Sequence, residues 1–566
     1  MPAFDGPAHT HPQLEALLAA GTRLTAPGGP FEIGVEDVRG EPMEVLVHRP
    51  RSLREVLAAA IDKGDVEAMV FSDGRRVTFA QFGRDVASMA AWMQTEQGIG
   101  RGDRVAICGA NSYGWIVTFW SCLSIGALTV AMNGWWTENE MQHALDLTEP
   151  ALLMFDARRA ERLDPAITTA RFDLDADLDE LLAYAPDAGL PDTPIDEDDG
   201  AILIFTSGTT GRPKAAVLAH RSVIAYSTLQ NFIGARAMVA AGITPPAGAP
   251  SPTRLAVFPL FHVSGLGATV NSIATGARTA WFLGRFDADE VIRFVIDERV
   301  NVIGGTGTHI LRLLDSPLCA QLPTEQILSV GMGGSATTPE IQRRVYDRFP
   351  HLEHTMSTGY GSTETGALVS FAPSFLLEAS PDCIGPALPT VQVRIIDEDG
   401  VEQPEGGVGN IWVRSPLVMT EYWRHPAANA EAFTPDRYVN TGDFGRIEGD
   451  CVYIASRKRD IIIRGGENIY PFEIENCIEE IPGVVETAVF GVDHPTLGQE
   501  AKAVVVIAPH STLTDLDIHE HCRRFLASYK VPAIVELRTE RLPRNPSGKI
   551  LKHVVAGEGD VTFVEE

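Results

Sequence analysis

Cysteine is scarce in this sequence, and its spacing is not that of a metal site or a disulfide scaffold. The 566 residues contain seven cysteines, at positions 108, 122, 319, 383, 451, 477 and 522, without a C-x-x-C pair. Zinc sites need closely spaced ligands, and disulfide scaffolds need dense, paired cysteines. We therefore predict neither, and expect reduced thiols in a cytoplasmic protein.

Basic residues are also few relative to acidic ones. Lysine and arginine total 46 against 75 aspartate and glutamate residues, which gives a formal net charge of −29. Nucleic acids and anionic membranes bind surfaces that are locally basic. The composition argues against both partners, so any bound nucleotide has to be held by locally placed lysines, arginines and backbone N–H groups.

A membrane span and a secretion signal are not predicted. The N-terminal stretch MPAFDGPAHTHPQLEALLAAG lacks a basic region and a sufficient apolar region, and it is predicted to be a surface tail. An uncharged run of 33 residues, from Val105 to Thr137, is long enough to cross a bilayer. Glycine and asparagine interrupt it, so we predict a buried strand, helix and strand instead.

The length exceeds what one hydrophobic core supports, so at least two domains are expected. Apolar strands alternate with amphipathic helices, which indicates α/β architecture with mostly parallel sheets. Another pattern begins near residue 456 and predicts a small α+β unit. We predict an N-terminal extension over 1–50, a large domain over 51–456 and a small domain over 457–566. The acidic stretch 156–200 is predicted to be a solvated connector.

The strongest local motif is T-S-G-T-T-G-R-P-K at Thr206–Lys214, directly after an apolar strand. Its backbone N–H groups can approach a polyphosphate, and Lys214 supplies a positive charge. The motif differs from a Walker loop, because proline precedes the lysine and no Ser or Thr follows it. The residues predicted to bind phosphates are Thr206, Ser207, Gly208, Thr209, Thr210, Gly211 and Lys214.

Together with further motifs in the same order, this string resembles the adenylate-forming superfamily of acyl-CoA synthetases, adenylation domains and luciferases. The resemblance covers roughly residues 50–555 and extends over PLFH at 259–262, GGS at 333–335, YGSTE at 360–364, TGD at 441–443, RKRD at 457–460, RGGENIYP at 464–471 and PSGK at 546–549. It implies a large domain of stacked mixed α/β sheets with a distorted β-barrel subdomain, and a small mobile C-terminal domain.

The resemblance also implies how the nucleotide is held. Glu364 is an oxygen ligand suited to Mg²⁺, and Thr363 can contact the α-phosphate. Asp443 resembles the ribose-binding aspartate of the family, and Arg457 resembles its partner at the domain junction. The adenine is expected against Tyr360 and Gly361, and against the close backbone of Gly333, Gly334 and Ser335.

Catalysis is expected from Lys549, His262, Glu364 and Thr206. Lys549 matches the lysine that contacts the substrate carboxylate and the α-phosphate during adenylation, where charge builds up on both. His262 matches a position near that carboxylate. The resemblance implies that the small domain then rotates about Arg459, and that Arg464, Gly465 and Gly466 line the path of coenzyme A.

The acid pocket is assigned by resemblance to small or apolar residues. They are His262, Val263, Leu266, Gly305, Thr306, Gly331, Met332 and Thr358, with Ser264 and Gly304 beside them. This lining suits a hydrophobic acyl or aryl acid, and it offers no fixed cation for a second carboxylate. Leu266 replaces the tryptophan that gates a fatty-acid tunnel in some long-chain relatives.

The sequence therefore predicts an AMP-forming carboxylate–CoA ligase that uses ATP, Mg²⁺ and coenzyme A. A stand-alone enzyme that loads a carrier protein, a luciferase-type oxidase and a non-catalytic adenylate-binding protein are the alternatives. Because 17 residues follow Lys549, no appended carrier domain is expected. The oligomeric state is left open, with a homodimer among the candidates.

Overall fold

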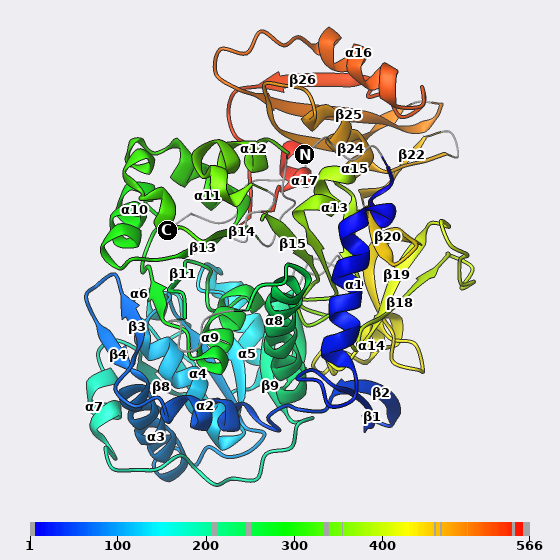
Figure 1. Ribbon diagram of the computed structural model, residues 1–566. Helices are drawn as coiled ribbons and strands as arrows, with labels where there is room; N and C mark the ends of the chain where they lie inside the picture. Colours follow the sequence, from blue (N-terminus) through cyan, green and yellow to red (C-terminus); the bar gives the residue numbers. More distant parts are fainter. Residues whose placement is uncertain are drawn as a thin grey trace.

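Two six-stranded sheets form the framework of the computed structural model, and a third, antiparallel sheet lies beside them (Figure 1). The structure describes residues 6–206, 213–244, 251–332, 339–353, 355–457, 460–464, 467–494, 496–545 and 549–557. Across these ranges, no helix combines the length and the apolarity needed to cross a bilayer. The predicted α/β class is confirmed.

The first sheet has the order β10-β9-β6-β5-β7-β8 and is parallel except for β10. Its strands are β5 Arg104–Cys108, β6 Leu128–Ala131, β7 Leu152–Phe155, β8 Ala170–Asp173, β9 Gly200–Thr206 and β10 Lys214–Ala219. Helix α4 (Tyr113–Ile125) joins β5 to β6 and is buried on all sides. The predicted βαβ unit in the uncharged run is therefore confirmed.

The second sheet has the order β14-β13-β11-β12-β3-β4, and only the β3–β4 hairpin is antiparallel. Its strands are β3 Glu67–Phe71, β4 Arg76–Thr78, β11 Arg254–Ala256, β12 Thr279–Trp281, β13 Val302–Gly305 and β14 Ser329–Met332. Parallel strands need covered faces, and helices cover both faces of each sheet.

The helices form one layer between the two sheets and one outer layer on each. The main core joins both sheets to α2 Leu53–Ile61, α3 Phe79–Thr95, α4, α8 His220–Ala240 and α9 Val263–Thr275. The outer face of the second sheet packs on α10 Ala288–Asp297, α11 Gly307–Asp315 and α12 Pro339–Arg348. The outer face of the first packs on α5 Glu138–Thr148. Short elements are α6 Ala157–Ala160, α7 Leu178–Ala183, η2 Pro317–Gln321, η3 Thr324–Gln326 and η4 Pro350–Leu352.

The third sheet is antiparallel, with the order β17-β21-β20-β19-β18. Its strands are β17 Cys383–Pro386, β18 Gln392–Ile396, β19 Gly409–Arg414, β20 Val439–Glu448 and β21 Cys451–Arg457. The elements near this sheet are β15 Ser357–Tyr360, β16 Ser370–Pro373, α13 Ser374–Ala379 and α14 Pro426–Ala432. A distorted barrel was expected here. In the described chain no pairing joins β17 to β18, so this sheet is open.

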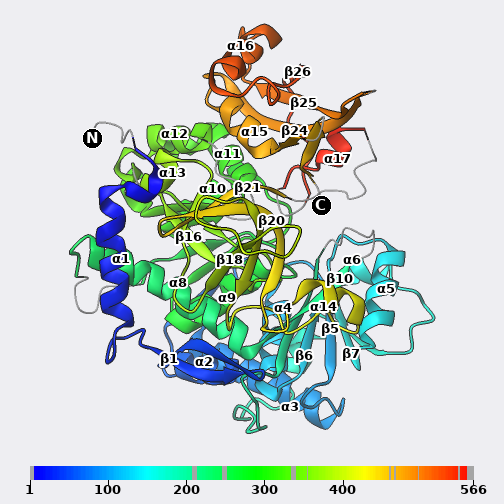
Figure 2. The same cartoon turned by 90° about the vertical axis from the view of Figure 1, so that its right-hand side faces the viewer.

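The C-terminal region has a separate hydrophobic core and lies beyond α11 and α12 in both views (Figures 1 and 2). It contains β22 Ile462–Arg464, β23 Glu467–Ile469, β24 Val484–His494, β25 Gly498–Ile507, β26 Ile534–Arg538, α15 Pro471–Glu479, α16 Asp515–Phe525 and α17 Lys552–Val555. Arg541 lies 3.8 Å from Asp315 of α11. The domain boundary at residue 456 stays a prediction.

The N-terminal segment is ordered, so the prediction of a surface tail is wrong. It forms η1 Ala8–Thr10, α1 Pro12–Thr25, β1 Ile33–Val38 and β2 Glu41–Leu46. His11 caps α1, and Pro12 occupies its first turn. Leu14 and Leu17, three residues apart on one helix face, are buried in a cluster with Leu376 and Leu377 of α13.

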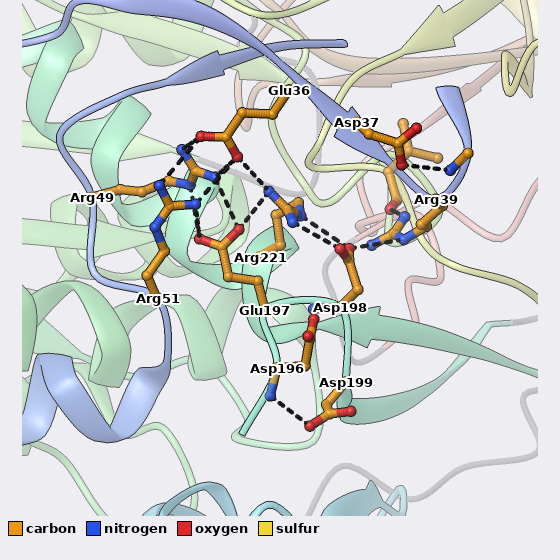
Figure 3. A network of polar contacts seen from close by, with 12 residues as sticks. Glu36, Asp37, Arg39, Arg49, Arg51, Asp196, Glu197, Asp198, Asp199 and Arg221 are labelled. Carbon is orange, nitrogen blue, oxygen red and sulfur yellow. Dashed lines mark hydrogen bonds and ion pairs between the residues drawn. The ribbon is translucent and has the colours of Figure 1, made fainter. Parts of the chain in front are cut away.

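A network of ion pairs ties this segment to the first sheet (Figure 3). Glu197 accepts hydrogen bonds from Arg49 at 2.9 Å and lies 2.5 Å from Arg221. Hydrogen bonds from Arg49 lower the pKa of Glu36 to about 2. Only 6% of the Glu197 side chain is exposed, so the prediction that 156–200 is a solvated connector fails at this end. The acidic residues there neutralise buried arginines.

We expect Glu197→Ala to destabilise the protein strongly, because it leaves Arg49 and Arg221 buried without this partner. Removing one member of a buried ion pair costs about 3–5 kcal/mol. Urea unfolding followed by circular dichroism measures the loss. Asp347→Ala is the matched control, because the Asp347–Arg343 pair is 66% and 61% exposed and should contribute below about 1 kcal/mol. Equal effects of the two substitutions would contradict this assignment.

Candidate active site

The β9–β10 hairpin brings together the two ends of the predicted phosphate loop. Thr206 ends β9, Lys214 begins β10, and the two stand opposite each other in the antiparallel register. Of the residues between them, Ser207, Gly208, Thr209, Thr210, Gly211 and Arg212 lie outside the described residues. The strand ends therefore position Thr206 and Lys214 at the base of this loop.

Tyr422 connects Lys214 to Glu364. The Lys214 ammonium lies 5.1 Å from the centre of the Tyr422 ring, and the Tyr422 hydroxyl donates a 3.0 Å hydrogen bond to Glu364 Oε1. Burial and the nearby Glu364 charge raise the pKa of Tyr422. The tyrosine is therefore a stable donor that orients the carboxylate, and it places the predicted metal ligand beside the predicted phosphate-binding lysine.

The turn that carries Glu364 requires glycine at two positions. Gly366 has φ +69°, and a Cβ there would lie 2.3 Å from the Leu417 carbonyl oxygen. A Cβ at Gly361 would lie 2.3 Å from the Ala367 backbone. The Thr363 carbonyl accepts from the Gly366 N–H, which closes the turn. Main-chain sterics thus fix the positions of Thr363 and Glu364.

Tyr360 and Asp443, both predicted to bind the nucleoside, are in contact. The Tyr360 hydroxyl donates a 2.7 Å hydrogen bond to Asp443 Oδ2. Asp443 is 7% exposed, and its Cα stands opposite that of Arg457 in the β20–β21 pair. The side chain of Arg457 and the predicted adenine contacts Gly333, Gly334 and Ser335 lie outside the described residues.

His262 and Lys549 act on one another electrostatically, although 287 residues separate them in the sequence. His262 precedes α9 as its N-cap and is half-buried. Burial, with a further contribution from the Lys549 charge, lowers the pKa of His262 to about 4. The imidazole is therefore neutral at pH 7. The lysine of the small domain thus lies close enough to His262 to affect its titration.

The structure describes only part of the other residues predicted in the small domain. Arg464 ends β22 and stands opposite Gly498 of β25. Gly465 and Gly466, predicted with it to line the coenzyme A path, lie outside the described residues. The predicted hinge residue Arg459 does so too, so these assignments stay predictions.

Open space borders two facing glycines of the second sheet. Gly304 of β13 and Gly331 of β14 are partners in the parallel register. A Cβ at Gly331 would meet no atom within 4 Å, and one at Gly304 would meet only the Leu255 carbonyl oxygen, at 3.8 Å. The absence of side chains here leaves room for part of a substrate.

The remaining residues of the predicted pocket divide into two groups. Val263, Ser264 and Thr358 are half-buried, which is compatible with a lining role. Leu266 is buried in the main core and Met332 in the second core. Thr306 caps α11 by accepting from the His309 N–H, and a Cβ at Gly305 would lie 2.9 Å from His309. These four residues support the local packing.

The sequence did not indicate the contact of Tyr422 with Glu364. Tyr422 follows a glutamate in an ordinary loop, and nothing in its local sequence indicates a contact 58 residues away.

The described residues contain no cluster of three or more potential metal ligands. Mg²⁺ is usually held by one or two carboxylates together with substrate phosphates. Glu364, a single carboxylate near Lys214, fits that arrangement, in which the phosphates supply the other ligands.

Comparisons with known proteins show which family the sequence resembles. The sequence matches the family model of AMP-binding enzymes over residues 57–423 and that of the AMP-binding enzyme C-terminal domain over residues 473–549. A feruloyl-CoA synthase from an Amycolatopsis species is 33% identical over 486 residues, covering 85% of this chain and 93% of that protein. A long-chain-fatty-acid–CoA ligase from Mycobacterium tuberculosis is 33% identical over 500 residues, covering 86% and 94%.

Solved structures also superpose on most of this chain. ATP-bound MatB from Rhodopseudomonas palustris superposes with a TM-score of 0.76 at 28% identity, covering 89% of this chain and 98% of that one. A Mycobacterium tuberculosis fatty acyl CoA synthetase has a TM-score of 0.68 at 28% identity, covering 90% and 98%.

We expect Lys549→Met to raise the pKa of His262, because the substitution removes a positive charge that disfavours the imidazolium. The pKa should stay below the ordinary value of about 6.5, because burial is the larger cause. NMR titration of histidine-labelled protein measures the shift, with His262→Gln to assign the signal. Lys530→Met is the control, because Lys530 bonds Glu473 within the small domain. A His262 signal unmoved by Lys549→Met would contradict the proximity of the two residues.

Proposed function

Because this chain belongs to the AMP-binding enzyme family, we propose that it is an acyl-CoA synthetase for a hydrophobic carboxylic acid, either a medium- to long-chain fatty acid or an aryl acid. It joins the acid to AMP with release of pyrophosphate, and then transfers the acyl group to coenzyme A with release of AMP. Two observations carry the proposal: Lys549 interacts electrostatically with His262, and Tyr422 joins Lys214 to Glu364.

ATP is bound by groups with separate tasks. Asp443, held by Tyr360, accepts from the ribose hydroxyls, since a carboxylate can accept two hydrogen bonds at once. Lys214 and the loop after Thr206 contact the phosphates. Glu364 would hold Mg²⁺, which supplies charge neutralisation on the phosphates when bound. Local charges of this kind overcome the unfavourable net charge of −29.

Adenylation joins one oxygen of the substrate carboxylate to the α-phosphorus of ATP, and the bond from that phosphorus to the pyrophosphate oxygen breaks. Negative charge grows on the α-phosphate oxygens in the transition state. The Lys549 ammonium is the mobile positive charge that stabilises it. His262 stays neutral because of its low pKa, so it orients the carboxylate without forming an ion pair that would weaken the nucleophile.

Thioester formation requires a second arrangement of the small domain. The sulfur of coenzyme A attacks the acyl carbon, the bond to the AMP oxygen breaks, and the thiol proton is lost. We propose that the small domain rotates about Arg459, so that Lys549 leaves the site and Arg464, Gly465 and Gly466 line the path of the thiol. The ion pair of Arg541 with Asp315, at 3.8 Å, is a contact that such a rotation breaks at little cost.

Lys549→Ala should lower the rate of adenylation by about a hundredfold or more, as for other transition-state charge contacts. Thioester formation from supplied acyl adenylate should survive. Pyrophosphate release and consumption of the adenylate with coenzyme A measure the two half-reactions. Lys502→Ala, which removes a lysine paired with Glu536 at 2.8 Å in the small domain, is the control. Equal losses in both half-reactions would refute the assignment of Lys549 to adenylation alone.

A product that forms with a carrier protein and not with coenzyme A would favour the carrier-loading alternative.

Gly331→Val should shift specificity towards smaller acids, because the new side chain fills the open space beside β14. We expect kcat/KM for a bulky aryl acid to fall about tenfold relative to that for a four-carbon acid, which corresponds to about 1.4 kcal/mol of lost binding. The ratio of the two constants is the measurement. Gly234→Val, also at an open position but on α8, controls for general effects. An unchanged ratio would remove Gly331 from the pocket.

A further inference from the structure

We propose that Arg254, together with Tyr226, binds an acceptor oxygen on the end of the acid remote from the activated carboxyl group. The substrates are then acids that carry a distal carbonyl, hydroxyl or carboxylate oxygen, and plain hydrocarbon chains are poorer. This inference rests on the proposed function and narrows its substrate class.

Arg254 lies on the face of the second sheet that borders the space beside Gly304. Along β11, Leu255 belongs to the second core and Ala256 to the main core. Side chains alternate along a strand, so Arg254 shares the face of Ala256, towards α8 and α9. In β13, Ile303 belongs to the second core, so Gly304 lies on the same face as Arg254. The arginine and the glycine gap are thus on one side of the sheet.

Arg254 pairs with no carboxylate in the part of the chain that the structure describes. Its Nε is shielded from solvent and has no hydrogen-bond partner, while the residue as a whole is half-buried. Burial lowers the pKa of Arg254. By contrast, Arg278, directly before the neighbouring strand β12, bonds both Glu67 and Glu298. A shielded N–H group without an acceptor is costly, and a ligand oxygen can complete its hydrogen bonds.

Tyr226 supplies a second polar group at the same place. Arg254 and Tyr226 interact electrostatically, and the Tyr226 hydroxyl accepts a 3.3 Å hydrogen bond from Gln230. With that bond accepted, the hydroxyl proton is free to be donated to a ligand. An arginine offers only donors, so the ligand group that satisfies both residues is an oxygen acceptor.

The spacing of residues along α9 gives the distance between Tyr226 and the reacting carboxyl group. Tyr226 packs against Gly267, where a Cβ would lie 2.9 Å from the tyrosine hydroxyl. Gly267 is five residues beyond His262, which is about 7.5 Å along the helix axis at 1.5 Å per residue. A ring joined to the carboxyl by a short chain spans this distance. Gly267 is the position that admits the tyrosine ring, since any side chain there would collide with it.

The proposed pair differs from the expectation that the pocket offers no fixed cation. The predicted pocket consists of residues at or near His262, Gly305, Gly331 and Thr358. Arg254 lies eight residues before His262 at the start of a strand, where an arginine would ordinarily reach solvent. The alternation of side chains along β11 places Arg254 on the face that packs against α8, which is the proposed substrate side.

The test compares matched acids by pyrophosphate release: 3-(4-hydroxyphenyl)propenoic acid, its 4-carboxyl analogue and the isosteric 4-methyl acid. We expect the wild type to favour at least one oxygen-bearing acid over the methyl acid by about tenfold or more in kcat/KM, since hydrogen bonds to charged groups have about this strength. Arg254→Met should reduce that ratio about ten- to a hundredfold, and Tyr226→Phe should reduce it less. Arg293→Met, on the exposed face of α10, should leave it unchanged.

Two results would overturn the inference: a wild type that prefers the methyl acid to both others, or an Arg254→Met protein, folded by its thermal transition, with an unaltered ratio. The first result needs no variant, so misfolding cannot obscure it. Turnover of the methyl acid in either case would leave the proposed synthetase function standing. Absence of pyrophosphate release with every acid tested would refute the function and this inference together.

Discussion

The antiparallel pairing of β9 with β10 is the constraint on which the rest of the site depends. It sets Thr206 opposite Lys214, and an added segment extends it: the Val217 N–H bonds the Glu421 carbonyl, and the Trp423 N–H bonds the Ala215 carbonyl. This pairing carries Tyr422 to Lys214 and to Glu364. Lysine, tyrosine and glutamate come from three distant parts of the chain. The backbone hydrogen bonds align Tyr422 with Lys214, and the Tyr422 hydroxyl bonds Glu364.

The ion-pair network flanks this hairpin along the chain (Figure 3). Glu197 and Asp198 directly precede β9, Arg221 lies in α8 directly after β10, and Glu36 lies in β1. From the N-terminal segment, Arg39 pairs with Asp198 at 3.2 Å and donates to the Val418 carbonyl. Because the neighbouring Met419 N–H bonds the Glu364 carbonyl, the N-terminal segment braces the turn that bears the predicted metal ligand. A part of the chain remote from Glu364 in the sequence thus helps to position that residue.

Much of this arrangement was predictable from local sequence, and the failures have physical causes. Alternating strands and helices have short-range signals, so the α/β fold was within reach. The motifs assigned Tyr360 and Asp443 to nucleoside binding through the family resemblance, and the structure adds that the two are in contact. The burial of Glu197 depends on arginines from distant segments, and a run of acids alone is typical of a solvated surface. Tyr422 was missed for the same reason, since its role arises only when two loops meet.

The glycines of the site differ in how freely they can be replaced. Gly361 and Gly366 are held by backbone atoms 2.3 Å from where a side chain would begin, so the nucleotide half tolerates no substitution there. Gly304 and Gly331 have ordinary backbone angles and open surroundings. Point mutations at these two glycines can therefore reduce the proposed acid pocket without strain on the main chain. Single substitutions could thus change which acid fits while the turn that carries Glu364 stays unchanged.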